Sequence, residues 1–404
     1  MSTSILYHAF GLQGIKYTAT HFVADRMVFS AEMNHQRIKC PACGCRETSF
    51  KGKRRRFFSM SPIGRKKCML ELMLHRLKCR SCSALWWPTL PFMTGTHRYV
   101  RSFALTVLDM LRFATISSVA DFLGVGWDLV KNIHKERLQL LYREIPLHKV
   151  ECIGIDEFSF KEGHHYMTVV TDLYSGRVLH AVEGKGKEDI RPFLKTLARR
   201  GKKLEAVAMD MSGAYFWAVH EELPGVKVVF DRFHVVFHMN QAIDELRRDH
   251  QGELDSLGQQ TLKGSRFLLL RNYDSLESDR KARLDALLKA NQPLFVIHSM
   301  KEQLRLFWEL DNRKEAEQFL AVWCRDAMNS GIKALKRVGK TLAAYRTGLL
   351  NYCDHRITSG AVEGHINKIK TLKTQAYGFR DPEYFKLRLY HLHTQQYSLI
   401  GGTR

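Results

Sequence analysis

The sequence contains no apolar run approaching the roughly 18–20 residues that a membrane span needs. Its first ten residues lack a basic segment followed by a long apolar stretch, so we expect no secretory signal. Nine cysteines in a chain without an export signal argue against a disulfide framework and for reduced thiols, some of which bind metal. These absences predict a cytoplasmic protein.

Acidic residues are also scarce, most of all near the N-terminus. The 404 residues, enough for two to four domains, include 63 lysines and arginines but only 41 acidic residues, a net charge of +22. Residues 1–150 hold 24 basic and nine acidic residues, and residues 37–80 hold 14 basic and two acidic residues. So local an excess predicts an anionic polymer or membrane surface as partner, although it can also be only a solvated surface.

Four cysteines form two CxxC pairs, Cys40 with Cys43 and Cys79 with Cys82, with 35 residues between the pairs. Four thiolates suit one tetrahedral structural Zn²⁺. The alternating run over residues 68–77 and the turn before it predict two or three strands between the pairs. We therefore expect a zinc-ribbon-like module over residues 1–95.

Other interpretations of these cysteines stay open. The four thiols can be buried or redox-active, although a thioredoxin-type site needs a βαβ pattern that is absent here. Cys45 can replace Cys43 as a ligand.

A dense basic run lies inside the same module. It consists of Lys51, Lys53, Arg54, Arg55 and Arg56. We expect these side chains to contact DNA phosphates, which adds affinity but little sequence information.

Residues 96–148 change to a helical period. Apolar residues recur at helical spacing over 103–114, 116–123 and 127–142, and Gly124 ends the second helix. Helix, glycine-containing turn and helix is the helix-turn-helix pattern, although any three-helix bundle gives it. The predicted DNA-reading side chains, on the exposed side of the third helix, are Lys131, Asn132, His134, Lys135 and Arg137.

From residue 149 onward strands and helices alternate. Strand-like runs cover residues 153–160, 165–172, 177–183, 204–211 and 226–231. Helical runs cover residues 187–200, 214–223 and 235–248. Three antiparallel strands followed by α-β-α-β-α is the order of a ribonuclease-H-like mixed-sheet fold. Residues 251–345 look wholly helical and predict an all-α insertion between a first part of this core, 149–250, and a final part, 346–404.

Three carboxylates fall where such a fold carries its active site. Asp156 lies on the first strand, Asp210 follows the fourth, and Glu363 lies in the first turn of a late helix. A pair of Mg²⁺ (or Mn²⁺) ions about 3.5–4 Å apart clamps the attacking and leaving oxygens in phosphoryl transfer, and such ions prefer carboxylate oxygens. Alone, either aspartate reads equally well as an ordinary strand-end or turn residue. Together they predict an enzyme that cuts and rejoins nucleic acid.

Other polar residues surround these positions. Strand alternation turns Glu157 to the face opposite Asp156. Asp231 also ends a strand and rivals Asp210; we rank it as an active-site neighbour together with Arg232 and His234. Three lysines are expected to hold the DNA backbone beside the metals: Lys368, Lys370 and Lys373.

The ordered runs CPxC…CxxC, GIDEF, AVAMDMS, VVFDRFHV and SGAVEGHINKIKTLKT resemble the bacterial insertion-sequence transposases of the ISL3 family. The resemblance extends over nearly the whole chain. It implies an N-terminal zinc module, a helix-turn-helix and an Asp-Asp-Glu core with a helical insertion. By motif position the implied triad is Asp156, Asp210 and Glu363. The commoner family run has Asp where this chain has Glu157, a change that should not touch metal binding.

We therefore expect a DNA transposase that binds terminal inverted repeats through residues 1–145. It would cleave the element ends and join the freed 3′-hydroxyls to target DNA, as a homodimer or higher oligomer on double-stranded DNA. The expected location is the bacterial cytoplasm, at the nucleoid when bound to DNA, with no membrane partner. The alternatives are a structure-specific nuclease on the same core and a zinc-containing, sequence-specific DNA-binding regulator, which would tolerate Asp156→Asn.

Overall fold

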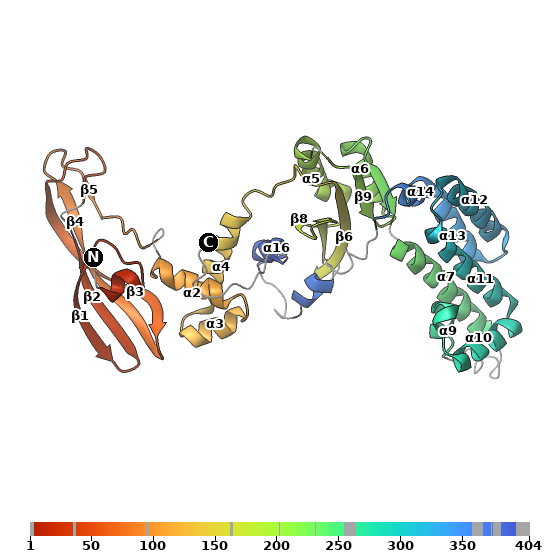
Figure 1. Cartoon of the computed structure of the whole chain (residues 1–404), viewed down its shortest axis with the longest axis horizontal. Coiled ribbons are helices and arrows are strands. Elements are labelled where there is room, and N and C mark those ends of the chain that lie inside the picture. The colour runs from red at the N-terminus through yellow and green to blue at the C-terminus, as the bar shows by residue number, and fades with distance from the viewer. Residues whose placement is uncertain are drawn as a thin grey trace. The chain divides into compact units, whose positions relative to one another are not determined.

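The computed structural model describes residues 4–34, 38–93, 97–161, 165–201, 203–230, 232–253, 264–357, 367–372, 374 and 381–392 (Figure 1). The chain divides into two compact units. The first is built mainly on Met1–Arg143, and the second spans Glu144–Thr394. Within the described residues no helix has the length and apolar character needed to cross a membrane.

The first unit contains a five-stranded sheet with the order β1-β2-β4-β3 and β5 paired to β4. Its strands are β1 (Ile15–Val23), β2 (Arg26–Met33), β3 (Thr48–Ile63), β4 (Lys66–Cys79) and β5 (Leu85–Trp86). The β2–β4 pair is parallel and the others are antiparallel. Buried and more exposed residues alternate along β4, as its alternating sequence predicts, and Leu70, Leu72 and Leu74 are buried. The β1–β2 hairpin lies outside the elements predicted from the sequence.

Helices complete the first unit: α1 (Ile5–His8), α2 (Arg101–Met110), α3 (Ile116–Leu123) and α4 (Trp127–Leu141). The hydroxyl of Thr115 accepts the Ser118 amide at 3.1 Å and caps α3, which ends at Gly124 with a φ of 61°. One hydrophobic core joins sheet and helices, because Phe58 of β3 belongs to the same cluster as Val107 of α2. The zinc-ribbon-like and helical segments predicted separately are therefore packed as one body.

The second unit contains a five-stranded mixed sheet with the order β10-β9-β6-β7-β8. Its strands are β6 (Cys152–Lys161), β7 (His165–Asp172), β8 (Val178–Glu183), β9 (Ala206–Met209) and β10 (Lys227–Phe230). Strands β6, β7 and β8 are antiparallel, whereas β9 and β10 run parallel to β6. The connecting helices are α5 (Lys187–Arg200), α6 (Gly213–Glu222) and α7 (Arg232–Glu253). Elements and order match the predicted ones.

The two faces of this sheet are covered by different parts of the chain. Ile153 and Ile155 of β6 belong to a core that includes residues of α5, α6 and α7. Phe158 and Phe160, on the opposite face, pack with residues 369 and 372 and with Phe385 of α16 (Pro382–His391). The segment 367–372 is helical. Residues from the end of the chain therefore cover the face of β6 that carries the even-numbered side chains.

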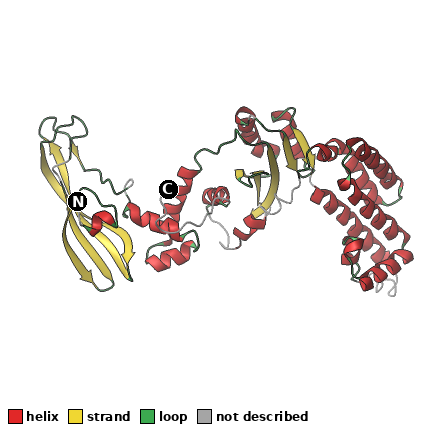
Figure 2. Cartoon of the chain, in the orientation of Figure 1, coloured by secondary structure: helices red, strands yellow, loops and turns green. Residues whose placement is uncertain are grey.

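The described residues from 264 to 354 form only helices (Figure 2). They are α9 (Arg266–Leu270), η2 (Tyr273–Ser275), α10 (Ser278–Ala290), α11 (Gln292–Leu306), η3 (Phe307–Glu309), α12 (Arg313–Asn329), α13 (Lys333–Ala344) and α14 (Arg346–Asp354). Trp308 and Trp323 are buried among them. Helix α14 contacts the sheet: Asn351 Nδ2 donates to the Val228 carbonyl at 2.8 Å. A Cβ at Gly348 would lie 2.2 Å from the Phe230 ring, so this approach requires glycine.

Candidate active site and metal centre

The four predicted zinc ligands come together at one end of the β3–β4 pair, where Thr48 faces Cys79. Their sulfur atoms all lie within 4.8 Å of one another, and the Cys40–Cys82 and Cys43–Cys79 separations are 3.6 and 3.5 Å. Thiolates about 2.3 Å from a tetrahedral zinc ion are roughly 3.8 Å apart, so the cluster has the size of a zinc site.

The remaining thiols of this region lie outside the cluster. Cys45 Sγ accepts the Glu47 amide at 3.3 Å and the Ser81 hydroxyl at 3.1 Å, so it supports a loop beside the ligands. Cys68 is buried in the core of the unit. Backbone amides, that of Cys82 first, lower the pKa of Cys79 to about 6, whereas the pKa of Cys43, whose sulfur lies 3.5 Å away, is raised.

The basic run lies on β3, and its members differ in their surroundings. Lys51 and Lys53 are exposed. Arg54 stacks on the Trp87 ring at 4.1 Å, and Arg55 pairs with Glu71 at 3.1 Å. Arg56 donates to the His97 carbonyl at 3.2 Å, and burial is the first cause of its lowered pKa. The two lysines are therefore the members most available to a phosphate backbone.

Helix α4 presents most of its predicted DNA-reading residues outward. Asn132 and Arg137 are exposed, Lys135 is half-buried, and Lys131 lies over the Trp127 ring at 5.5 Å. The prediction that His134 is exposed is wrong, since it is only 5% exposed. It falls one turn after Val130 and one turn before Leu138, on the apolar side of the helix.

The sheet register brings Asp156 and Asp210 to the same place. Gly154 of β6 pairs with Ala208 of β9 in parallel register; Asp156 comes two residues later on β6, and Asp210 comes two residues later, directly after the end of β9. Side chains at the same level of neighbouring parallel strands point to the same face, with strands about 4.8 Å apart. Both residues are half-buried. Asp156 Oδ1 accepts the Glu157 amide at 2.7 Å, and Asp210 Oδ1 accepts the Ser212 amide at 3.1 Å.

Glu157 lies on the opposite face, as alternation predicts. Its Oε2 accepts the hydroxyl proton of Tyr215, from α6, at 2.8 Å, and the Thr168 hydroxyl lies 2.8 Å from the same tyrosine oxygen. Lys185 Nζ is 3.9 Å from Glu157 Oε1. Burial, ahead of the neighbouring charges, raises the pKa of Tyr215, which keeps it a hydrogen-bond donor. Tyr215 was not predicted from the sequence, where its only signal is a position five residues after Asp210.

Helix α7 brings two histidines toward Asp210. His238 interacts electrostatically with both His234 and Asp210, and burial is the first cause of its lowered pKa. His234 was predicted as a neighbour of the site, whereas His238 was missed, although it follows at the i+4 position of the same helix. Arg232 is exposed and lines a cavity beside α7. Asp231, the rival to Asp210, lies outside the described residues.

Glu363 and Lys373 also lie outside the described residues. Lys368 and Lys370 are exposed, and Ile369 between them is fully buried. Ile369 packs with Phe158, two residues after Asp156 on the same face of β6. The helical turn that follows Glu363 in sequence is therefore anchored on the face that carries the two aspartates.

A transposase family model of the ISL3 DDE type matches residues 153–389, more than half of the chain. The chain belongs to the ISL3 transposase family. The transposase is 34% identical over 354 residues to the transposase for insertion sequence element IS1001 of Bordetella parapertussis, covering 87% of each chain. It is 28% identical over 255 residues, 57% of each chain, to the transposase for insertion sequence element IS1557 of Mycobacterium tuberculosis.

A solved structure also resembles the transposase, although distantly. A chain of the Drosophila P element transposase strand transfer complex aligns with 73% of it, covering 91% of that chain, at 11% identity and a TM-score of 0.37. A likeness of this size supports no argument about fold or mechanism.

The family assignment confirms the expected function. The transposase is a DNA-acting enzyme that uses divalent metal to cleave DNA and to transfer a strand. The regulator and structure-specific nuclease alternatives gain no support from these relatives. The matched region begins on β6 and ends within α16, so it includes both aspartates and the helices that cover their face.

Proposed function

We propose that the transposase recognises the terminal inverted repeats of its insertion sequence, cleaves each element end and joins the freed 3′-hydroxyls to target DNA. The main support is the parallel pairing of Gly154 with Ala208, because Asp156 and Asp210 each follow two residues after this pair. Two element ends must meet for transposition, so the enzyme acts as a homodimer or higher oligomer on DNA.

The sheet order supports a ribonuclease-H-like core. Three antiparallel strands are followed by two strands parallel to the first, with helices between them. On this interpretation residues 251–345 form an all-α insertion, and residues 346–404 return to the sheet. The packing of Ile369 and of Phe385 against β6 is what such a return requires.

Asp156, Asp210 and Glu363 are the proposed ligands of two Mg²⁺ (or Mn²⁺) ions, since carboxylate oxygens are the donors that these cations prefer. Bound there, the metals would polarise the scissile phosphate and activate the attacking oxygen. The backbone amides of Glu157 and Ser212 fix the orientation of the two aspartates.

Basic residues of the first unit and of the final part of the core are the proposed contacts to DNA. One structural Zn²⁺ held by Cys40, Cys43, Cys79 and Cys82 would lock the end of the β3–β4 pair. The proposed phosphate contacts are Lys51, Lys53, Arg54, Arg55, Arg56, Lys368, Lys370 and Lys373. Helix α4 would place Lys131, Asn132 and Lys135 against base edges or phosphates.

Cleavage of a defined duplex tests the proposal. The terminal repeat is read from the DNA that flanks the gene, and the purified protein is incubated with that duplex and Mg²⁺. We expect Asp156→Asn and Asp210→Asn to lower end cleavage by at least about 10³-fold, since the metals supply several kcal/mol of transition-state stabilisation. Glu157→Gln is the matched control and should keep cleavage.

Binding separates the catalytic defect from loss of DNA affinity. Both aspartate variants should bind the duplex as tightly as the unmodified protein. Wild-type cleavage by Asp156→Asn would refute the catalytic assignment, and equal cleavage of duplexes with unrelated ends would refute repeat recognition.

A further inference from the structure

Two hairpin tips of the first unit lie side by side at one end of its sheet. One joins β1 to β2 and the other joins β3 to β4, and the parallel β2–β4 pairing begins beside them. Lys66 Nζ of the second tip donates to the Ala24 carbonyl of the first at 2.8 Å. We call the two tips together, residues 22–26 and 63–67, the double tip. It lies at the end of the β3–β4 pair opposite the zinc cluster.

The double tip adjoins the turn between α3 and α4, the turn of the predicted helix-turn-helix. The Lys67 side chain passes so close to Gly124 that a Cβ at this glycine would lie 2.1 Å from Lys67 Nζ. Ile63 of the double tip and Met27, directly after it, pack on the same hydrophobic core as Val125 of the turn. Helix α4 begins three residues after Gly124. The double tip is therefore anchored beside the N-terminal end of the helix predicted to read DNA.

The double tip is basic. It contains four basic residues, Arg26, Arg65, Lys66 and Lys67, and one acidic residue, Asp25, a net charge of +3. Asp25 lies 3.5 Å from Arg26 and 3.8 Å from Lys67. Arg65 and Lys66 are exposed, and neither has a carboxylate partner among the described residues. These two cations are therefore the ones most available to an anionic partner.

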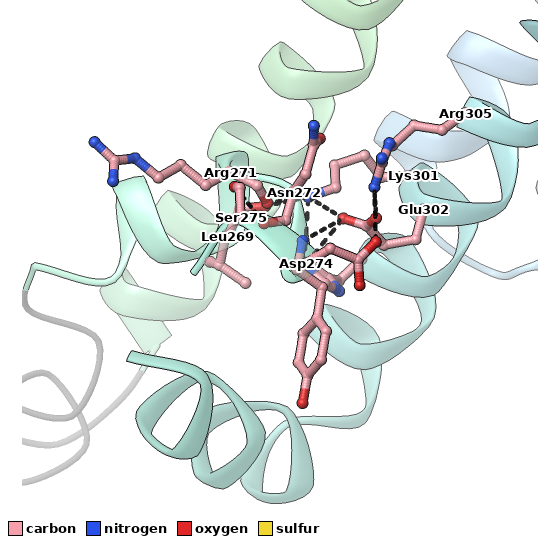
Figure 3. A network of polar contacts seen from close by, with 10 residues as sticks. Leu269, Arg271, Asn272, Asp274, Ser275, Lys301, Glu302 and Arg305 are labelled. Atoms are coloured by element: carbon pink, nitrogen blue, oxygen red, sulfur yellow. Dashed lines mark hydrogen bonds and ion pairs between the residues drawn. The ribbon is translucent and has the colours of Figure 1, made fainter. Parts of the chain in front are cut away.

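Basic side chains in the helical part of the second unit show the contrasting case. Lys301 Nζ lies 2.8 Å from a Glu302 carboxylate oxygen, and Arg305 Nη1 donates to the same carboxylate at 2.6 Å (Figure 3). Their charge is balanced within the protein. The charge of Arg65 and Lys66 is not balanced in this way, which favours the double tip as a contact surface.

Apolar side chains project from the same place. Phe22 is 73% exposed and Val23 is 57% exposed. Phe122 of α3 and Trp127 of α4, on the two sides of the adjoining turn, are exposed too. Exposed apolar residues rimmed by charged ones mark an interaction site. The double tip therefore combines what contact with a phosphate backbone and with stacked bases requires.

The position beside α4 indicates which part of a duplex the double tip would meet. A recognition helix in the major groove contacts base edges through its N-terminal residues. Structure beside that end of the helix faces the neighbouring phosphates and the minor groove beyond them. The minor groove is only about 6 Å wide, but apolar side chains enter it and part successive base pairs.

We propose that the double tip is a second DNA-binding element, which holds the terminal repeat beside α4. Arg65 and Lys66 would neutralise phosphates, and Phe22 and Val23 would enter the minor groove. The inference rests on the proposed function, because it takes α4 to be the helix that reads the repeat.

Binding to a duplex that carries the terminal repeat tests the apolar contact. The repeat is read from the DNA that flanks the gene, and dissociation constants are measured by fluorescence anisotropy without Mg²⁺, so that the duplex stays uncut. The double variant Phe22→Ala/Val23→Ala should bind about tenfold more weakly, since two apolar side chains lose their contact. The control is Leu85→Ala, because Leu85 is also exposed but pairs with Lys78 at the zinc end of the sheet.

Footprinting locates the contact on the DNA. Hydroxyl radicals cut at sugars that are reached from the minor groove, so a bound tip protects them. The Phe22→Ala/Val23→Ala variant should lose one protected patch and keep the rest of the footprint. Both residues are exposed, so its melting curve should match that of the wild type and exclude a folding defect.

Salt dependence tests the phosphate contacts. Arg65→Gln/Lys66→Gln should reduce the slope of log K against log salt concentration by about 2, because each neutralised phosphate contributes roughly 0.9. Lys195→Gln/Arg199→Gln removes the same charge from exposed positions on α5 of the second unit and should leave the slope unchanged.

The outcomes separate this inference from the proposed function. If both double-tip variants keep the wild-type affinity, salt slope and footprint, the double tip is only a solvated surface and the inference is wrong. Weaker binding of Phe22→Ala/Val23→Ala with an unchanged footprint overturns the minor-groove contact. If the wild-type protein does not prefer the repeat to an unrelated duplex, repeat recognition itself fails, and the proposed function fails with it.

Discussion

Removing the hydroxyl of Tyr215 tests directly whether Glu157 and Asp156 lie on opposite faces of β6. Tyr215 is fully buried and donates to Glu157 at 2.8 Å. Tyr215→Phe removes this bond and the 2.8 Å contact with the Thr168 hydroxyl, and leaves Asp156 on the other face of β6 unchanged. It should therefore lower stability and leave catalysis intact.

The size of the effect follows from the contacts that remain. A hydrogen bond to a charged group contributes about 1.5–3 kcal/mol. The Glu157 side chain keeps 27% exposure and Lys185 at 3.9 Å, so water and the ammonium compensate for part of the loss. We expect about 1–2 kcal/mol, a fall in Tm of roughly 2–8 °C for a body of this size.

Circular dichroism melts measure the stability of the variant, and cleavage assays run well below the Tm measure its catalysis. The cleavage rate of Tyr215→Phe should stay within about threefold of wild type. Glu157→Gln, which keeps an acceptor for Tyr215, should lose less stability and should also cut. If either variant loses cleavage about a hundredfold with an unchanged Tm, Glu157 belongs to the reacting site and the face assignment is wrong.

Three further predictions concern other parts of the molecule. Cys43→Ser should lower zinc affinity by at least about 100-fold by competition with a chelator, whereas Cys45→Ser should keep one zinc per chain. Gly348→Ala should lower the urea midpoint, because overpacking against Phe230 costs about 1–3 kcal/mol and outweighs a helix-propensity gain of about 1 kcal/mol; a raised midpoint would contradict the contact. Burial, then the neighbouring Lys301, lowers the pKa of His298 to about 4. Between about pH 6.5 and 4 the unfolded state therefore binds a proton that the folded state does not, so stability should be lost as pH falls through that window. His298→Gln should make the melting temperature less dependent on pH over the same range.

The sequence predicted much of the second unit because its signals are local. Strand alternation and helical periodicity gave the elements around Asp156 and Asp210, and alternation alone turned Glu157 away. Asp172 and Asp189 also act locally, in a turn and at a helix start, where they accept the amides of Tyr174 and Gly186.

What the sequence could not supply depends on contacts between distant segments. The β1–β2 hairpin is joined to β4 by a parallel pairing that no local pattern announces. The shared core of sheet and helices, which includes Phe58 and Val107, depends on packing over 49 positions of sequence. His134 was misplaced because a polar residue on an apolar stripe is buried by its neighbours. The cavity beside α7 was not predicted because its walls come from helices far apart in sequence: α7, α9, α11, η3 and α14.

The helix α16, which packs on the face of β6 that carries Asp156, is synthesised long after the strands of the sheet. The amide of Ala181 on β8 donates to the Tyr390 hydroxyl of α16 at 3.3 Å, across 209 residues. At synthesis rates of about 5–20 residues per second, the strands leave the ribosome roughly 10–40 s before their covering helix exists. A nascent or truncated chain would carry the aspartates on an unfinished surface and could not cut. Activity would then begin only on chains translated nearly to their end.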